Sequence, residues 1–281
     1  MRRNIPYIVT VHDAWWISDD QFLVNDDGFL QFPSRDVLAD SKNSRHGNRS
    51  IARRQRLASL LQNAQAVLSV SAPFAEIYTN AGIGNVTVVE NGTPVIESAE
   101  RAPRGDGRVA LGHIGGRSAH KGAALIEAAL RRNEFTNLHL TMVDGTLGSG
   151  QSVDTIWGTT PVTLTAPFPQ SEVAQLYGAL DVLLAPSTWP ESYGLVTREA
   201  LQAGLWVVAS DLGAIGQDIV EGQNGNVVKV DTTAGLYEVL QRIDDDHTRY
   251  IFRGSSPVHD RKRNAKNQAA DIHSIYDRLA K

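Results

Sequence analysis

Glu191 and Glu199 stand on either side of a glycine in the stretch PESYGLVTREA, residues 190–200. An apolar strand is predicted directly before this stretch, and a helix directly after Gly194. Ligands of open parallel sheets bind beyond the carboxyl ends of the strands. The first turn of a helix offers unpaired amide groups and a positive dipole end, which together attract an anion. A sugar joined through a diphosphate to a ribose would fit here, with one glutamate on each side. Taken singly, Glu191 could be merely solvated, and Glu199 could merely complement the helix dipole.

A glycine-rich loop upstream carries two cations that could meet the same anion. The stretch GHIGGRSAHKGAALIEA, which begins at Gly112, leads from a predicted strand into a helix and places Arg117 close to Lys121. A diphosphate that departs in a transfer reaction needs cationic compensation, which an enzyme without a metal must supply from side chains. Arginine and lysine on a loop are otherwise ordinary surface charges, so the two cations alone do not define a site.

The elements that must position these residues follow from hydrophobic patterning. Strand-like apolar runs alternate with helical patterns, which predicts an α/β fold with parallel sheets. The predicted strands are 7–11, 66–71, the first part of 85–92 before a turn, the first part of 108–116 before a loop, 138–145, 161–166, 181–187 and 206–210. The predicted helices are 51–64, 72–82, 121–133, 171–180, 198–204, 234–244 and 267–281.

Chain length and one polar stretch predict two domains. The 281 residues are enough for about two domains of ordinary size. The stretch ESAERAPRGDG, residues 97–107, is charged and contains proline and glycine, which favours an interdomain linker over a surface loop within one domain. We expect a partial N-terminal domain over 1–96, a complete doubly wound unit over 108–260, and a C-terminal helix over 261–281 that could return to the N-terminal domain.

Composition excludes several classes of protein. The chain has no cysteine, which removes disulfides, thiolate nucleophiles and thiolate metal sites. Its net charge of −4 provides no basic field for nucleic acid. No apolar run approaches the ~20 residues that span a bilayer. No histidine pair has helical metal spacing with a carboxylate partner, so no metal site is expected. The acidic loop does not follow the EF-hand spacing and is expected to be solvated; its members are Asp19, Asp20, Asp26 and Asp27.

Two further groups near the N-terminus have open interpretations. A basic stretch fits a solvated helix face, or attraction to a lipid phosphate or an anionic membrane surface; its members are Arg45, Arg49, Arg53, Arg54 and Arg56. Trp15 and Trp16 fit core packing, or stacking on an acceptor sugar.

The carboxylate stretch carries a family resemblance. PSTWPESYGLVTREALQAG, which begins at Pro186, resembles the Glu-x7-Glu signature of retaining glycosyltransferases of family 4, the glycosyl transferases group 1. That family has the GT-B fold, so the resemblance implies an α/β protein of two Rossmann-like domains with parallel sheets. It implies that Glu191 is a catalytic residue that contacts hydroxyls of the donor sugar, and that Glu199 binds the ribose of the nucleotide. The amides that would face the diphosphate are those of Gly194, Leu195 and Val196.

The resemblance extends to two other regions. The loop with Gly116, Arg117 and Lys121 is similar to the family's Gly-Arg…Lys-Gly donor site, which implies that these residues bind the diphosphate. VTVHDAWW resembles the strand-end histidine of the family's N-terminal domain, so His12 would be a second catalytic residue near the donor sugar. His12 could instead be a histidine hydrogen-bonded at a strand end. Asp13 could orient it or cap a turn.

The implied activity is retaining, metal-independent transfer of a sugar from a nucleotide-diphosphate sugar to an acceptor hydroxyl. The acceptor would be a glycan or a lipid-linked saccharide, as in polysaccharide biosynthesis, and no cofactor is expected besides the nucleotide-sugar substrate. A cytoplasmic location is expected, with or without contact to the inner face of the membrane. One alternative is a non-catalytic nucleotide-sugar-binding half that needs a partner chain or a missing N-terminal segment. Another is a GT-B epimerase or phosphorylase.

The resemblance is incomplete at three places. Only about three strands are predicted before residue 96, where the family has a full domain. A piece of a longer protein, a half completed by a homo- or hetero-oligomeric partner, and a small acceptor domain all fit. Ala166 and the run Gly216-Gln217-Asp218 also depart from the family's usual residues, so the pocket for the base, and hence the nucleotide, is not assigned.

Overall fold

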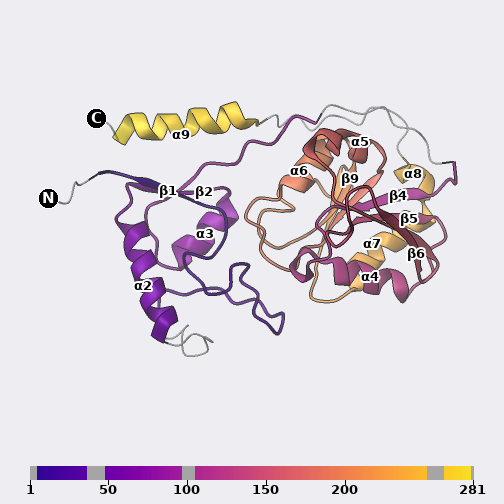
Figure 1. The fold of residues 1–281 in the computed structure, drawn as a ribbon, viewed down its shortest axis with the longest axis horizontal. Helices are drawn as coiled ribbons and strands as arrows, with labels where there is room; N and C mark the ends of the chain where they lie inside the picture. Colours follow the sequence, from indigo (N-terminus) through magenta and orange to yellow (C-terminus); the bar gives the residue numbers. More distant parts are fainter. Residues whose placement is uncertain (1–4, 37–47, 97–104, 252–262, 280–281) are drawn as a thin grey trace. The chain divides into compact units, whose positions relative to one another are not determined.

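The chain divides into two compact units. The computed structural model describes residues 5–36, 48–96, 105–251 and 263–279 (Figure 1). The first unit consists of the described parts of 1–92, 189–193 and 263–281, and the second of the described parts of 93–188 and 194–262. Most of the predicted linker, residues 97–104, lies outside the described residues.

The second unit is built on a seven-stranded sheet with the order β10-β9-β8-β4-β5-β7-β6. Every neighbouring pair is parallel except β6 and β7, which are antiparallel. The strands are β4 (Val109–His113), β5 (Leu138–Val143), β6 (Ser152–Trp157), β7 (Thr160–Thr165), β8 (Val182–Ala185), β9 (Trp206–Ser210) and β10 (Gly225–Val228). The predicted strands in 108–210 are confirmed, and β6 is an addition.

Helices cover both faces of this sheet because its central strands are apolar on both sides. Successive strand residues point to opposite faces, and in β8 Val182 and Leu184 pack with one cluster while Leu183 and Ala185 pack with another. The first face carries α4 (Ala123–Arg131) and α7 (Ala234–Asp245), and the second α5 (Val173–Gly178) and α6 (Leu195–Gln202) (Figure 1). The remaining helices are the short η1 (Ala119–Lys121), η2 (Gln170–Glu172) and α8 (His247–Tyr250).

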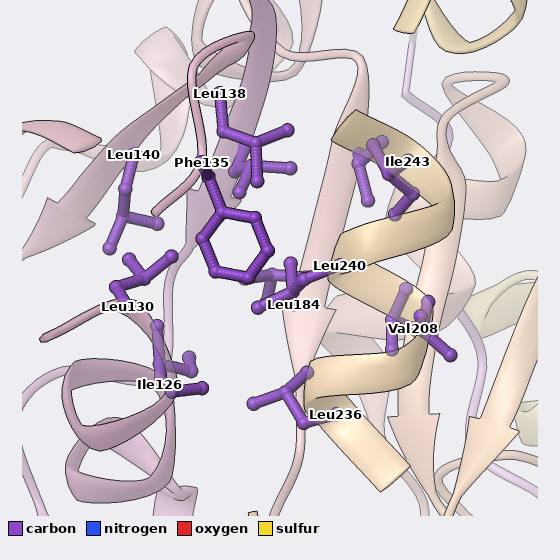
Figure 2. Packing of buried hydrophobic residues seen from close by; sticks show 14 of the residues in the cluster. Ile126, Leu130, Phe135, Leu138, Leu140, Leu184, Val208, Leu236, Leu240 and Ile243 are labelled. Carbon is purple, nitrogen blue, oxygen red and sulfur yellow. The ribbon is translucent and has the colours of Figure 1, made fainter. Parts of the chain in front are cut away.

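Helix α7 shows how the first face is packed. Leu236, Leu240 and Ile243 recur at helical spacing and point together into the cluster around Phe135 and Leu184 (Figure 2). All five of these side chains are at most 1% exposed. This continuous apolar layer holds the strand ends in fixed positions, which a site built on those ends requires.

The crossover from β5 to β7 contains no helix. The chain leaves β5, runs along the sheet edge as β6, and turns at Gly158 back into β7, with Trp157 paired to Thr160. Gly158 has φ +61°, and a Cβ there would lie 2.4 Å from the carbonyl oxygen of Leu130, so the hairpin requires glycine. Apolar patterning missed β6 because only Trp157 of its residues is buried.

The first unit has a small parallel sheet with the order β1-β2-β3. Its strands are β1 (Ile8–Val11), β2 (Ala66–Ser69) and β3 (Val86–Val88), and its helices are α2 (Asn48–Gln62), α3 (Ala72–Asn80) and α9 (Ala265–Leu279). Ser71 caps α3 by accepting a hydrogen bond from the amide of Phe74 at 3.2 Å, as its position before the helix predicts. Ile275 of α9 packs with Ala66 and Leu68 of β2, so the end of the chain covers this sheet.

The tip of the β8–α6 connection also belongs to the first unit. In this segment, Trp189–Tyr193, the Trp189 ring meets the Phe22 ring edge-on at 4.8 Å. The Tyr193 hydroxyl donates to the carbonyl of Asn91 at 2.8 Å. Glu191 lies between these two aromatic anchors and is 7% exposed, so it is not the solvated glutamate of the simpler interpretation.

The basic stretch only partly forms a solvated face. Arg53 turns inward, where it pairs with Asp19 at 3.1 Å and its guanidinium lies 4.6 Å from the centre of the Trp15 ring. Arg54 is 6% exposed, whereas Arg49 and Arg56 are exposed; Arg45 lies outside the described residues. The prediction that the acidic loop is wholly solvated is therefore wrong for Asp19, because a partly buried arginine holds it.

The two tryptophans have different environments. Trp15 is 51% exposed and has the Arg53 guanidinium over its ring. Trp16, in contrast, packs against the hydrophobic core of the first unit. Core packing is therefore confirmed for Trp16 and wrong for Trp15.

Candidate functional site

The predicted anion-binding residues of the second unit lie at one edge of its sheet. Strands β4, β5, β8 and β9 are parallel neighbours, so their carboxyl ends meet at the same edge. The loop with Gly116 and Arg117 follows β4, and helix α6 follows the loop after β8. This is the edge at which open α/β sheets bind ligands.

His113 fixes the start of the glycine-rich loop. It ends β4, is 1% exposed, and its ring nitrogens lie 2.9 Å from the carbonyl of Leu184 and 3.0 Å from the carbonyl of Gly116. Burial lowers the pKa of His113, and the two neighbouring carbonyls oppose this shift. The ring therefore ties β8 to the turn at Gly116, whose φ of +71° suits glycine.

The far end of the same loop is tied to the loop after β8. Gly122 has φ +82°, and a Cβ there would lie 2.0 Å from the carbonyl oxygen of Pro186. The amide of Thr188 donates to the carbonyl of His120 at 2.9 Å. These contacts place Lys121 beside the chain that leads toward α6, as a common diphosphate site requires.

Arg117 is oriented by two carboxylates. Its Nη1 lies 3.4 Å from Oδ2 of Asp144, and its Nη2 lies 3.7 Å from Oε2 of Glu127. Asp144 follows β5, is 3% exposed, and accepts hydrogen bonds from the amide and hydroxyl of Thr146. These bonds, and to a lesser degree Arg117, lower the pKa of Asp144. A fixed, ionised carboxylate thus holds one side of a guanidinium that is 47% exposed.

Helix α6 begins with open amide groups. Gly194 precedes it with φ +79° and no side chain caps the first turn, which carries no acidic residue. A Cβ on Gly194 would lie 2.9 Å from the Cα of Ile215, so the helix start packs directly on the loop after β9. The amides of Gly194, Leu195 and Val196 therefore lie at the start of this helix. No acidic residue in the first turn neutralises the positive end of the helix dipole there.

Glu199 lies one turn into the same helix. Its Oε2 accepts a hydrogen bond of 3.0 Å from the hydroxyl of Tyr177, which comes from α5 and is 1% exposed. Burial raises the pKa of Glu199, and the Tyr177 hydrogen bond opposes that shift. The carboxylate is thus half-buried beside the amide groups of the helix start.

Sequence analysis missed two residues that shape this site. Arg198 is 6% exposed and its Nε lies 2.8 Å from Oδ2 of Asp218, on the loop after β9. The hydroxyl of Thr197 lies 2.9 Å from the carbonyl of Ile215 on the same loop. Both residues sit inside the recognised carboxylate stretch, yet their partners on the β9 loop have no local sequence signal.

The two predicted catalytic residues belong to the first unit. His12 directly follows β1 and is exposed. Asp13 accepts from the amide of Trp15 at 2.9 Å and from Gln21 at 2.8 Å, so it caps a turn. The structure thus places the predicted diphosphate and ribose residues at one edge of the second unit's sheet, while the binding roles of these residues, and the roles of His12 and Glu191, stay predictions.

Within residues 5–36, 48–96, 105–251 and 263–279, no group of three or more histidine, aspartate or glutamate side chains could hold a metal ion. Over the same ranges, no helix is long and apolar enough to span a membrane.

Comparison with known sequences points to one family. Residues 108–246 match the family described as glycosyl transferases group 1. The D-inositol 3-phosphate glycosyltransferase of Corynebacterium aurimucosum is 27% identical over 155 residues, which cover 52% of this chain and 37% of that protein. The phosphatidyl-myo-inositol mannosyltransferase of Mycolicibacterium smegmatis is 43% identical over 82 residues, 28% of this chain and 21% of that protein. The chain thus matches well under half the length of these relatives.

Solved structures share the fold across both units. Sucrose-phosphate synthase from Thermosynechococcus elongatus superposes with a TM-score of 0.62 at 20% identity, covering 90% of this chain and 69% of that one. Anabaena HepE in complex with UDP superposes with a TM-score of 0.64 at 17% identity, covering 97% of this chain and 72% of that one. These proteins are GT-B glycosyltransferases, so the fold predicted for this chain is confirmed.

Proposed function

Because residues 108–246 belong to the glycosyl transferases group 1 family and the chain has the GT-B fold, we propose that it binds a nucleotide-diphosphate sugar and transfers the sugar to an acceptor hydroxyl. One observation carries the proposal. The loop of Arg117 and Lys121 and the uncapped start of α6 occupy the same sheet edge, and the Thr188 amide, which donates to the carbonyl of His120, ties the first of them to the loop after β8. Cationic side chains and helix amides at one edge suit a diphosphate.

The donor would lie along the carboxyl edge of the second unit. Arg117 and Lys121 compensate the charge of the diphosphate, and the amides at the start of α6 receive its oxygens. Glu199 accepts hydrogen bonds from the ribose hydroxyls. Structures of Anabaena HepE are described in complex with UDP and with UDP-glucose, which supports a nucleoside diphosphate as the leaving part of the donor.

In the proposed transfer, the bond between the anomeric carbon and the diphosphate oxygen breaks, and its electron pair stays on the diphosphate. The acceptor oxygen bonds to the anomeric carbon on the same face, and its proton passes to the departing diphosphate. Arg117 and Lys121 stabilise the charge that develops on the leaving group, so no metal is required. The family resemblance implies that Glu191 contacts the sugar hydroxyls and that His12 is a second catalytic residue.

Loss of the ammonium group tests this assignment. UDP-glucose, GDP-mannose and ADP-glucose are first tested with the wild type to find the donor that it uses. We expect Lys121→Ala to abolish hydrolysis and transfer of that donor and to weaken binding of the matching nucleoside diphosphate. Removing one preorganised charge at a departing group typically costs on the order of 100-fold in rate. The matched control is Lys266→Ala, on the exposed side of α9 in the first unit, which should be unchanged. Full activity of the Lys121 variant would refute the proposed site.

A second candidate is a donor-binding half without activity of its own. The three-stranded sheet of the first unit and the short match to the curated relatives favour it. Calorimetric binding of UDP, GDP and ADP, followed by chromatography of activated sugars incubated with the same protein, separates the two candidates. Hydrolysis or transfer supports the enzyme, whereas binding without turnover supports the half.

A further inference from the structure

The hydroxyl of Tyr177 has no role in the proposed transfer. Tyr177 lies on α5 with its ring in the second-face cluster, among Leu183, Ala200 and Val207. A phenylalanine would fill the same apolar space, so packing does not explain a hydroxyl there. An unpartnered buried hydroxyl costs about 1–3 kcal/mol, and the hydroxyl of this 1% exposed residue has its partners on α6.

Both partners belong to the proposed donor site. The tyrosine oxygen lies 3.0 Å from Oε2 of Glu199 and 3.3 Å from the carbonyl oxygen of Val196. A phenol has one proton to donate, and the nearer, ionisable acceptor is the carboxylate. Burial and the neighbouring carboxylate raise the pKa of Tyr177, so the phenol keeps its proton and remains a donor.

The hydrogen bond leaves one carboxylate oxygen for a ligand. Oε2 of Glu199 is taken by Tyr177, and within the described part of the chain Oε1 has no hydrogen bond. Burial disfavours the ionised form of Glu199, and a carboxylate without a fixed partner could also rotate away from the site. The tyrosine opposes both effects.

We propose that Tyr177 is a positioning residue for the nucleotide's ribose: it holds one oxygen of Glu199 so that the other accepts a hydrogen bond from a ribose hydroxyl. The inference rests on the proposed function, because it takes the ligand to be a nucleoside diphosphate. Tyr177 itself does not touch the ligand. Its effect on binding should therefore appear only when the ligand carries ribose hydroxyls.

The test compares ribose and dideoxyribose nucleotides. Wild type and Tyr177→Phe are each titrated calorimetrically with UDP, GDP and ADP. The nucleotide that binds best is then compared with its 2′,3′-dideoxy analogue. We expect the variant to bind the ribonucleotide about tenfold more weakly, the loss of one hydrogen bond to a charged group. It should bind the dideoxy analogue as the wild type does. Tyr177→Phe should add nothing in a Glu199→Gln background, because the two residues act through one contact.

Structural effects are controlled separately. Tyr250→Phe makes the same chemical change beside Trp206, at the start of β9 and hence at the opposite end of the strands, and should leave both affinities unchanged. If Tyr177→Phe weakens both nucleotides equally, the tyrosine only supports the start of α6, and the proposal is wrong. Equal affinity of both proteins for the ribonucleotide also overturns it. If the wild type binds no nucleoside diphosphate, the proposed function fails first and takes the inference with it.

Discussion

At the scale of single residues, the candidate site depends on side chains whose pKa is set by burial and hydrogen bonding. Glu199 and Asp144 lie at the same sheet edge, yet burial raises the pKa of the first and hydrogen bonds from Thr146 lower that of the second. Asp144 therefore stays ionised beside Arg117 over a wide pH range. Glu199 ionises at higher pH than an ordinary glutamate, so its protonation makes stability depend on pH.

The raised pKa of Glu199 predicts the sign of that dependence. A carboxyl whose pKa is higher in the folded state stabilises the fold fully below the unfolded-state value, here 4.5, and loses that contribution as pH rises through the folded-state pKa. The melting temperature of wild type should therefore fall relative to Glu199→Gln as pH rises over that interval. Thermal unfolding of both proteins at several pH values measures it. A pH-independent difference would contradict the shift.

The ion pair of Arg198 with Asp218 carries a second residue-scale prediction. Both side chains are at most 10% exposed, so Arg198→Met leaves a buried carboxylate without its partner, at a cost of about 3–5 kcal/mol. Chemical denaturation should show that loss. The double variant Arg198→Met with Asp218→Leu should recover much of it, because no buried charge remains; a double variant less stable than the single would argue against this explanation.

At the scale of elements, the site is a junction of loops whose ends are tied by backbone contacts. Glycines stand at two close approaches of backbones, at Gly122 against Pro186 and at Gly194 against Ile215. Such contacts place the glycine-rich loop and the start of α6 without the help of long side chains. The position of the helix amides should then be sensitive to a single methyl group.

Gly194→Ala tests this sensitivity. The new Cβ would lie 2.9 Å from the Cα of Ile215, so the start of α6 or the loop after β9 must shift, and binding of the nucleoside diphosphate should weaken by about tenfold or more. Gly222→Ala is the matched control: Gly222 has a similar φ of +74° but no atom within 4 Å of the added Cβ. In the control, backbone strain should lower the free energy of unfolding by about 1 kcal/mol, and binding should be unchanged. Unchanged binding in the Gly194 variant would mean that the helix start does not hold the ligand.

At the scale of the whole molecule, the first unit is assembled from three separate stretches of the chain. Strands β1 to β3 come from the N-terminal part, α9 from the end, and Trp189–Tyr193 from the middle of the second unit's sequence. A sheet of three strands buries little apolar surface by itself, so the unit should depend on its covering helix.

Ile275→Ala measures that dependence. Ile275 is 6% exposed and packs on Ala66, Leu68 and Val89, so its truncation should cost about 2–5 kcal/mol in the stability of the first unit. The neighbouring Tyr276 is 51% exposed, and Tyr276→Ala should change stability by less than about 0.5 kcal/mol. Hydrogen exchange in β1 to β3 resolves the effect on this unit. Equal protection in both variants would show that α9 does not stabilise the sheet.

The sequence by itself determined the parts of this protein that have local signals. The apolar runs of β4, β5, β7, β8 and β9 each lie in a single stretch, and PESYGLVTREA places Glu191 and Glu199 on either side of a helix start. Only the tertiary structure decided that β6 closes the sheet edge, because its residues are mostly exposed and follow no buried pattern. It also decided that Tyr177 meets Glu199, that Arg198 meets Asp218, and that Ile275 covers β2. These contacts join residues far apart in the chain, and their energy comes from partners that no local pattern specifies.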